Sequence, residues 1–402
     1  MALATLTASG AEPARDSGAA VPAGAPVLFV ANVDFALRHF LLPLMREARA
    51  RGYEPIGACA EGPLLEVPRA EGFRVAAVPM ARSLSIKANW RALRALRRLI
   101  RETRPALVHG HFPISGLLAR VAARLEGVPR VAYTGHGFLF NQPGPRWRRW
   151  LSLGLEWFGG KLTDVFLTVS EEEAQDARRL GIAPHAVACG NGRDPAVFHP
   201  DAEARAALRA EFGARADDCV VVAVSRLVRH KGYPELLAAM EAVPGATLWV
   251  VGERLSSDHG ADMEPFFAHA ERMLGPRLRR LGYRHDVARV LAAADIFCLP
   301  SHFEGLPMSV IEAMLCALPV VSTDIRGPRE MVVEGETGLL VPPHEAEPLA
   351  VALRRLAEDP ALRTRMGEAG RARGLRLYAE RHVVGRTLDL LGLPPRIGAG
   401  AA

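Results

Sequence analysis

The sequence predicts an α/β protein with two domains, each built on a parallel β-sheet that helices cover on both faces. The chain has 402 residues, enough for two hydrophobic cores, and 49% of them are hydrophobic. Short apolar runs typical of buried strands alternate with longer runs of helical periodicity along the chain. A polar stretch at residues 191–217, containing glycine and proline, separates two halves that share this alternation.

Ten apolar runs in this alternation are predicted strands. In the first half they are residues 27–31, 54–59, 73–78, 106–109, 130–133 and 165–169, and in the second half they include 219–225, 247–251, 295–299 and 319–322. The first 26 residues, rich in Ala, Gly and Pro, lack the basic start and apolar centre of a signal peptide. We therefore expect a disordered tail (1–26), an N-terminal domain (27–195), a C-terminal domain (196–374) and a closing helix with a tail (375–402).

Composition and spacing exclude several classes of protein. The mean hydropathy is +0.08, and no stretch approaches the about 20 apolar residues of a spanning helix. Five scattered cysteines without Cys-x-x-Cys spacing favour reduced packing residues in a cytoplasmic protein over disulfides or metal ligands. The first strand is followed by Asn32-Val-Asp-Phe, without glycine, so the dinucleotide-binding fingerprint is missing and a dehydrogenase is not expected.

Two glutamates lie where a strand leads into a helix. Glu304 falls in the loop at the predicted helix start, and Glu312 lies roughly two turns along, beyond Pro307. Two carboxylates so placed can bind hydroxyls at two points of one elongated ligand. The amides of Leu306, Met308 and Ser309 would face an anionic part of that ligand. A nucleotide sugar has this shape. An ordinary surface helix with two solvated acids is the alternative.

A basic turn follows the first strand of the second half. Arg226 offers a planar fork and Lys231 a mobile point charge, and both suit a diphosphate at the carboxyl end of a sheet. The chain contains no Asp-x-Asp metal motif. We therefore expect no metal and no cofactor, with protein cations and helix amides stabilising the leaving group instead. A solvated basic turn is the alternative.

Six motifs between residues 282 and 342 occur together in order. They are Gly282-Tyr-Arg-His-Asp-Val, Ala294-Asp-Ile-Phe-Cys-Leu-Pro-Ser, Glu304-Gly-Leu-Pro with Glu312-Ala-Met, Leu318-Pro-Val-Val-Ser-Thr-Asp, Arg326-Gly-Pro-Arg-Glu and Gly335-Glu-Thr-Gly-Leu-Leu-Val-Pro. This series resembles the donor site of the retaining glycosyltransferases of family 4. The resemblance implies the GT-B fold, in which two Rossmann-like parallel-sheet domains face each other across an interdomain cleft.

The resemblance also implies roles for single residues. Glu304 would bind hydroxyls of the transferred sugar and Glu312 those of the ribose. Arg226 and Lys231 would neutralise the leaving nucleoside diphosphate. In the family, the turn that contains Arg284 borders the nucleobase, although Arg284 could equally be a charge at the rim. Pro307 stands where many members have glycine, so this helix start offers one amide fewer.

Three histidines of the first half lie near strand ends: His109 and His111 flank one, and His136 follows the next. His136, in Tyr133-Thr-Gly-His-Gly-Phe, occupies the position at which a family histidine meets the donor sugar near the reacting carbon, so the resemblance implies a catalytic role. A histidine beside glycines is otherwise an ordinary loop residue. His109 and His111 lack a third ligand at metal-like spacing, so we expect a loop role for them, not a zinc site.

Positive charge is concentrated in the first half. The net charge is +6, yet residues 27–192 alone hold 23 Lys and Arg against 14 Asp and Glu. One predicted helix places five basic residues on one face: Lys87, Arg91, Arg94, Arg98 and Arg101.

A second basic segment contains Trp147 and Trp150. Arginine beside tryptophan is typical of a helix on anionic lipid headgroups, so we expect peripheral membrane contact on the acceptor side. A solvated face with buried tryptophans is the alternative, and no nucleic-acid-binding module is evident.

Together these features predict a retaining, metal-independent enzyme that transfers a hexose or N-acetylhexosamine from a UDP- or GDP-sugar. By resemblance the acceptor is a polyprenyl-diphosphate-linked glycan of exopolysaccharide or capsule synthesis, at the cytoplasmic face of the cell membrane. The alternatives are a soluble acceptor, a sugar-nucleotide epimerase on the same fold, and a non-catalytic sensor.

Overall fold

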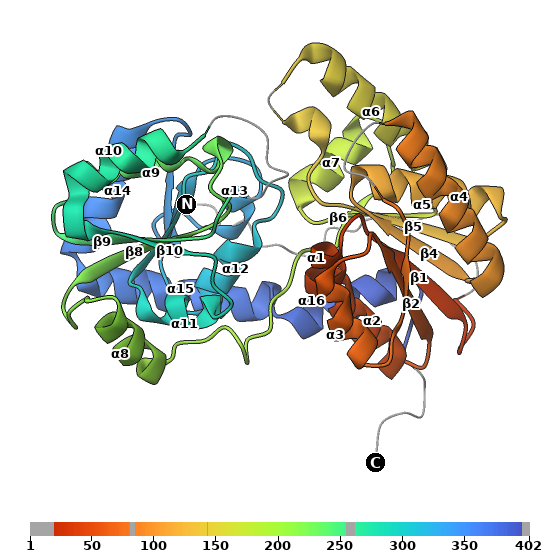
Figure 1. Ribbon diagram of the computed structural model, residues 1–402, viewed down its shortest axis with the longest axis horizontal. Helices are drawn as coiled ribbons and strands as arrows, with labels where there is room; N and C mark the ends of the chain where they lie inside the picture. Colours follow the sequence, from red (N-terminus) through yellow and green to blue (C-terminus); the bar gives the residue numbers. More distant parts are fainter. Residues whose placement is uncertain (1–19, 81–84, 143, 255–261, 396–402) are drawn as a thin grey trace. The chain divides into compact units, whose positions relative to one another are not determined.

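The computed structural model describes residues 20–80, 85–142, 144–254 and 262–395. The chain folds into two compact units, of which unit 1 holds residues 1–189 and 384–402 and unit 2 holds residues 190–383. The division falls near the predicted seam, at 189/190, and a second time inside the closing helix. Figure 1 shows one sheet in each unit.

Unit 1 is built on seven parallel strands in the order β3-β2-β1-β4-β5-β6-β7. They are β1 (Pro26–Val30), β2 (Glu54–Cys59), β3 (Arg74–Ala77), β4 (Leu107–His111), β5 (Arg130–Gly135), β6 (Val165–Thr168) and β7 (Val187–Ala188). The order reverses between β1 and β4, which makes that pair the switch point of a doubly wound sheet.

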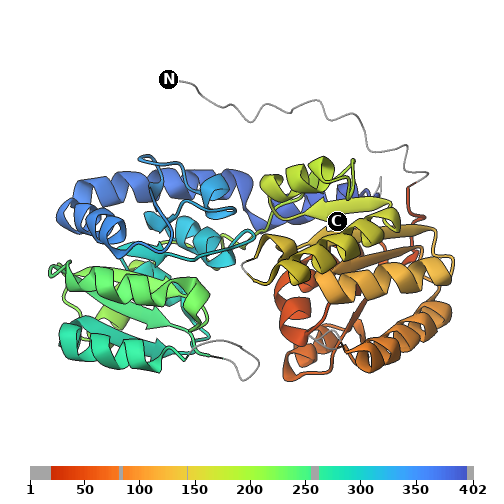
Figure 2. The same ribbon diagram turned by 90° about the horizontal axis from the view of Figure 1, so that it is seen from above.

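Helices cover both faces of this sheet (Figure 2). They are α1 (Asp34–Ala36), α2 (Leu42–Ala50), α3 (Glu66–Ala70), α4 (Ile86–Thr103), α5 (Pro113–Leu125), α6 (Arg146–Lys161), α7 (Glu171–Arg179) and α16 (Glu380–Leu390). Strand β1 contributes to two cores because successive side chains point to opposite faces. Val27 and Phe29 pack with α2 and α16, whereas Leu28 and Val30 pack with α4 and α5.

The closing helix belongs in part to unit 1. Leu388, Leu391 and Leu393 are buried in the same core as β1. The Arg51 guanidinium donates to the Leu393 carbonyl at 2.7 Å and pairs with Asp389 at 2.5 Å. Residues 388–393 therefore complete the core to which β1 contributes.

Unit 2 repeats the plan with six parallel strands in the order β10-β9-β8-β11-β12-β13. The strands are β8 (Cys219–Val224), β9 (Ala246–Val251), β10 (Leu278–Gly282), β11 (Ile296–Leu299), β12 (Val320–Thr323) and β13 (Gly338–Val341). The helices are α8 (Ala202–Glu211), α9 (Tyr233–Glu241), α10 (Glu264–Leu274), α11 (Val287–Ala293), α12 (Met308–Leu315), α13 (Pro328–Met331), α14 (Ala346–Glu358) and α15 (Pro360–Leu377). Helices α9, α10 and α14 pack on one face through one continuous core.

The predicted α/β architecture is confirmed, and all ten predicted strands are present within one or two residues at each end. Strands β7, β10 and β13 were not among the predictions. The expected tail at 1–26 is too long, because Val21 is buried and its N–H donates to the Gly392 carbonyl at 3.1 Å. Residues 1–19 lie outside the described residues.

Candidate functional site

The strand order of unit 2 reverses between β8 and β11, and this is where the predicted donor-site residues gather. Arg226 and Lys231 follow β8, and Glu304 follows β11. In doubly wound sheets, loops at the carboxyl ends of the two strands at such a switch point diverge and leave a crevice for ligands. The topology therefore explains why these distant segments form one site.

Lys231 and Glu304 form an ion pair with 2.6 Å between Nζ and Oε1. The Ser301 hydroxyl donates to the same Oε1, also at 2.6 Å. Among the described residues, Oε2 of Glu304 has no hydrogen-bond partner, and the Lys231 ammonium uses one of its three hydrogens. The pair thus keeps an acceptor and two donors available for a ligand.

The turn that carries Lys231 is held by close packing. Gly232 has φ +76°, and a Cβ there would lie 1.9 Å from the Pro300 carbonyl oxygen, so glycine alone fits. His230 stacks on Phe303 with ring centroids 4.6 Å apart, and its carbonyl accepts from the His302 N–H at 2.8 Å. These contacts tie the loop after β8 to the loop after β11. His230 is a packing residue of the site.

Glu312 lies in the second turn of α12 and pairs with Arg193 at 2.6 Å. Both side chains are nearly buried. Sequence reasoning missed Arg193, which lies 119 residues from its partner in a loop without a motif of its own. The Arg193 guanidinium fixes one carboxylate oxygen of Glu312, which orients that side chain.

The start of α12 carries the predicted amide donors. Pro307 is the N-cap residue of α12, so the N–H groups of Met308 and Ser309 belong to its first turn and have no acceptor within the helix. Leu306 is buried, and its carbonyl accepts from the Asn191 amide at 2.8 Å. The three predicted amide donors therefore lie at one helix end.

Arg226 and Arg284 differ in their surroundings. Arg226 is exposed in the segment after β8. The Arg284 guanidinium binds both carboxylate oxygens of Asp286, at 2.7 and 2.6 Å, and lies over the Phe212 ring. These contacts explain Arg284 without any ligand, and its role at the nucleobase stays a prediction.

In unit 1, three histidines form a hydrogen-bonded chain at the carboxyl ends of β4 and β5. His111 Nδ1 lies 3.0 Å from His136 Nε2, and His111 Nε2 lies 3.3 Å from His109 Nδ1. His109 Nε2 continues the chain to the Thr134 hydroxyl at 2.8 Å. The expected loop role for His109 and His111 is wrong, because both lie in β4 and are buried. Their His-x-His spacing was the missed signal, since alternate strand residues share a face.

Burial keeps this chain neutral at pH 7. It lowers the pKa of His136 to about 3, and burial followed by the charge of His136 lowers the pKa of His109 to about 3. A neutral imidazole carries one N–H, so each ring donates to the next in a single direction. The direction that the chain takes fixes whether Nδ1 of His136 is a donor or an acceptor. The tautomers of His109, His111 and His136 are therefore linked.

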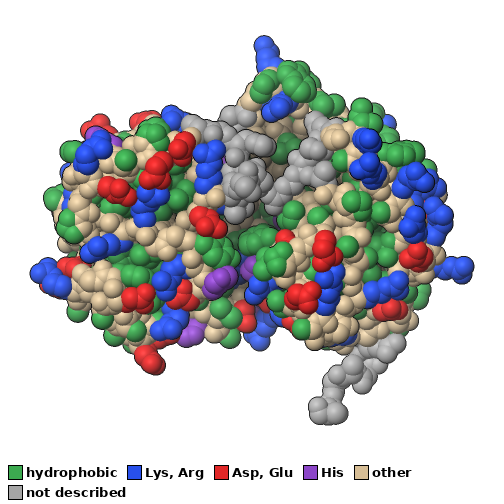
Figure 3. Space-filling view, viewed as in Figure 1, with side chains coloured by type: hydrophobic (Ala, Val, Ile, Leu, Met, Phe, Trp, Pro, Cys, Tyr) green, Lys and Arg blue, Asp and Glu red, His purple; other side chains and the backbone are tan. Residues whose placement is uncertain are grey.

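Basic and aromatic side chains of α4 and α6 are exposed. The five basic residues predicted to share a face of α4 all face solvent, and Lys and Arg side chains gather there (Figure 3). Trp90 on α4 is 58% exposed, and Trp147 and Trp150 on α6 are 60% and 69% exposed. The alternative of buried tryptophans is therefore wrong. No helix in the described part of the chain is apolar over a length that would span a membrane.

Comparison with known proteins identifies the family. Residues 39–197 match the model of "Glycosyltransferase Family 4", and residues 204–373 match that of "Glycosyl transferases group 1". The chain is 29% identical to the putative glycosyltransferase EpsD of Bacillus subtilis over 90% of this chain and 95% of the relative. It is 30% identical to a D-inositol 3-phosphate glycosyltransferase of Saccharomonospora viridis over 71% of this chain and 68% of the relative.

Two further comparisons bear on substrates and fold. The UDP-Gal:alpha-D-GlcNAc-diphosphoundecaprenol alpha-1,3-galactosyltransferase of Escherichia coli is 28% identical over 70% of this chain and 74% of the relative. The structure of Anabaena HepE in complex with UDP-glucose superposes with a TM-score of 0.78 and 20% identity, over 91% of this chain and 99% of that one.

Proposed function

Because the chain belongs to glycosyltransferase family 4 and has the GT-B fold, we propose that it transfers a hexose or N-acetylhexosamine from a UDP- or GDP-sugar with retention and without a metal ion. The observation that carries the proposal is the Lys231–Glu304 pair at the switch point of unit 2. In this proposal Lys231 binds the diphosphate, and Glu304, directly beside it, binds sugar hydroxyls.

Each residue of this site has a distinct task. The two remaining Lys231 hydrogens and the Arg226 guanidinium bind diphosphate oxygens, and the first turn of α12 adds amide hydrogens. Oε2 of Glu304 accepts from a sugar hydroxyl, and Glu312 accepts from the ribose. His136 is the predicted contact near the reacting carbon.

The bond between the anomeric carbon and the diphosphate breaks as the acceptor hydroxyl attacks from the same side. The departing phosphate oxygen takes the acceptor proton. Positive charge that is fixed before the reaction stabilises the leaving diphosphate as its negative charge grows.

Retention and metal independence can be measured together. After dialysis against EDTA, we expect added Mg²⁺ or Mn²⁺ to change the initial rate by less than about twofold, because protein cations carry the leaving-group charge. We expect NMR of the first product to show the anomeric configuration of the donor. An inverted product, or a rate abolished by EDTA and restored by Mg²⁺ or Mn²⁺, would contradict the mechanism.

We propose a polyprenyl-diphosphate-linked glycan as the acceptor, in exopolysaccharide or capsule synthesis at the cytoplasmic face of the cell membrane. The Escherichia coli relative is named for an acceptor of this kind. Among the relatives above, EpsD aligns over the largest share of this chain. Support from this chain comes from α4 and α6, where arginines and exposed tryptophans occur together. A soluble acceptor is the second candidate, favoured by the inositol phosphate enzyme.

Liposome flotation separates these acceptors. Changing Arg91, Arg94 and Arg98 to glutamine is expected to weaken partitioning onto anionic vesicles by about 100-fold, at roughly 1 kcal/mol per basic residue. A matched control changes three exposed arginines of unit 2, Arg272, Arg279 and Arg365, and should leave partitioning unchanged. Equal partitioning of both variants would contradict membrane contact through α4.

The epimerase alternative predicts a different reaction. Such an enzyme would consume UDP-GlcNAc without an acceptor, whereas the proposed transferase releases UDP or GDP in proportion to glycosylated acceptor. A coupled assay of nucleotide release and UDP-GlcNAc consumption separates the two reactions. Turnover in this assay also excludes a non-catalytic sensor.

A further inference from the structure

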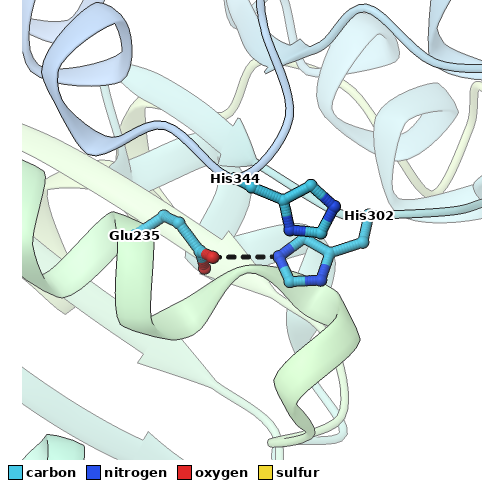
Figure 4. Close-up of side chains that lie close together, drawn as sticks. All are labelled: Glu235, His302 and His344. Atoms are coloured by element: carbon cyan, nitrogen blue, oxygen red, sulfur yellow. Dashed lines mark hydrogen bonds and ion pairs between the residues drawn. The ribbon is translucent and has the colours of Figure 1, made fainter.

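Three side chains of unit 2 that have no part in the proposed chemistry converge on one point (Figure 4). Glu235 lies in the first turn of α9, His302 follows β11, and His344 follows β13. Their potential ligand atoms all lie within 4.8 Å of one another. The residues are far apart in the sequence, which explains why no metal motif was apparent there.

The contacts within the group are direct. Oε1 of Glu235 lies 3.1 Å from Nε2 of His302. The His302 and His344 rings lie against each other, with centroids 3.9 Å apart and planes at 45°. Figure 4 shows Glu235 reaching the His302 ring while the His344 ring lies next to it. One carboxylate and two imidazoles form a ligand set that zinc uses in proteins.

One oxygen of the Glu235 carboxylate can still accept a hydrogen bond or bind a cation. Its Oε2 atom is buried and has no hydrogen-bond partner among the described residues. A buried carboxylate oxygen without a partner is costly, and native proteins normally satisfy such an atom with a donor or a cation.

His344 supplies an independent observation. Its φ is +68°, in the left-handed region that glycine enters without strain. Strained residues persist where the surrounding structure or a function requires them, and they cluster at ligand sites. His344 is exposed, whereas His302 and Glu235 are largely buried. The group therefore opens toward solvent on the His344 side, where an ion can enter.

We propose that Glu235, His302 and His344 bind a zinc ion, with a water molecule in the fourth position. Two nitrogen ligands favour zinc over Mg²⁺, which prefers oxygen ligands in octahedral geometry. The ion links the start of α9 to the loops after β11 and β13. His302 lies two residues before Glu304, and its N–H donates to the carbonyl of the residue before Lys231. Zinc therefore braces the loops that carry the donor-site pair and takes no part in the transfer step.

Zinc binding is measured on the full-length chain after removal of metals, by competition with a chromophoric chelator and with Co²⁺ as a spectroscopic probe. We expect one Zn²⁺ per chain, a rise in the thermal unfolding midpoint with Zn²⁺ but not with Mg²⁺, and Co²⁺ absorption typical of tetrahedral coordination. His344→Gly should weaken zinc binding by at least about tenfold, because it removes a ligand while suiting the backbone. His302→Ala should do the same.

The control is His285→Ala, which removes an exposed histidine elsewhere in unit 2 and should bind zinc like the unchanged protein. All five cysteines are buried, so they do not compete for the ion. Less than one Zn²⁺ per chain, or equal zinc affinity of His344→Gly and the unchanged protein, would overturn the proposal. The result does not depend on the proposed transfer reaction, whose rate in EDTA is measured separately.

Discussion

Replacing Lys231 with alanine is expected to lower kcat/KM for sugar transfer by about 10²–10³-fold, the usual cost of removing one fixed donor to a developing anion. The ammonium lies in a turn held by Gly232 and pairs with Glu304 at 2.6 Å. Its loss removes positive charge at the leaving diphosphate and also frees the Glu304 carboxylate from its fixed orientation. Initial rates of nucleotide release with saturating acceptor measure the effect.

Arg229→Ala is the matched control for this variant. Arg229 lies in the same short turn but is exposed. Its removal changes the net charge equally and should leave kcat/KM within about twofold, because exposed charges contribute little through solvent. Thermal unfolding of both variants checks that the fold is kept. A Lys231→Ala enzyme within tenfold of the unchanged protein would show that the pair does not carry the chemistry.

Arg120→Met is expected to destabilise unit 1 by about 3–5 kcal/mol, the usual cost of leaving one member of a buried ion pair alone. Arg120 on α5 and Glu156 on α6 are 1% and 4% exposed and lie 3.3 Å apart. The Tyr133 hydroxyl donates to Glu156 at 3.1 Å, and the Arg120 guanidinium lies over the Tyr133 ring. Methionine fills similar space but leaves Glu156 without its cation. Denaturant unfolding followed by fluorescence measures the loss.

The pH dependence of this loss identifies its cause. Burial already raises the pKa of Glu156 above its usual value, and removing the guanidinium raises it further. A folded-state pKa above the unfolded one stabilises the fold at low pH, and this stability is lost as pH rises, so the deficit should be larger at pH 8 than at pH 5.

Two further variants test the assignment to the buried pair. The double variant Arg120→Met with Glu156→Gln removes the buried charge and should recover most of the stability. Arg46→Met breaks an exposed pair with Glu71 and should cost about 1 kcal/mol or less. Equal losses for Arg46→Met and Arg120→Met would exclude burial as the cause.

The strands could be predicted because both faces of a parallel sheet are covered, which makes each central strand a continuous apolar run. Strand β10 escaped prediction for the opposite reason. It lies at the edge of its sheet, and its residues Arg279 and Arg280 are exposed. An edge strand with two arginines lacks the apolar pattern on which the predictions relied.

The candidate site was predictable where its residues occur in a local motif, as Glu304, Glu312 and Lys231 do. Arg193 and the histidine chain were not, because their partners are brought together by the sheet topology. His111 and His136 meet because β4 and β5 are paired in register, which places the ends of the two strands side by side. Local spacing cannot show such contacts.

Because the chain returns to unit 1 through α16, unit 1 completes its fold only after α16 has been synthesised. Domains usually fold as they emerge, at about 5–20 residues per second, with the amino-terminal one first. Here the leucines at 388, 391 and 393 are synthesised after all of unit 2, yet they fill the core around β1. The core around β1 is therefore completed only after unit 2 has been synthesised, and a polypeptide that stops before Leu388 leaves an apolar surface uncovered on α2 and β1.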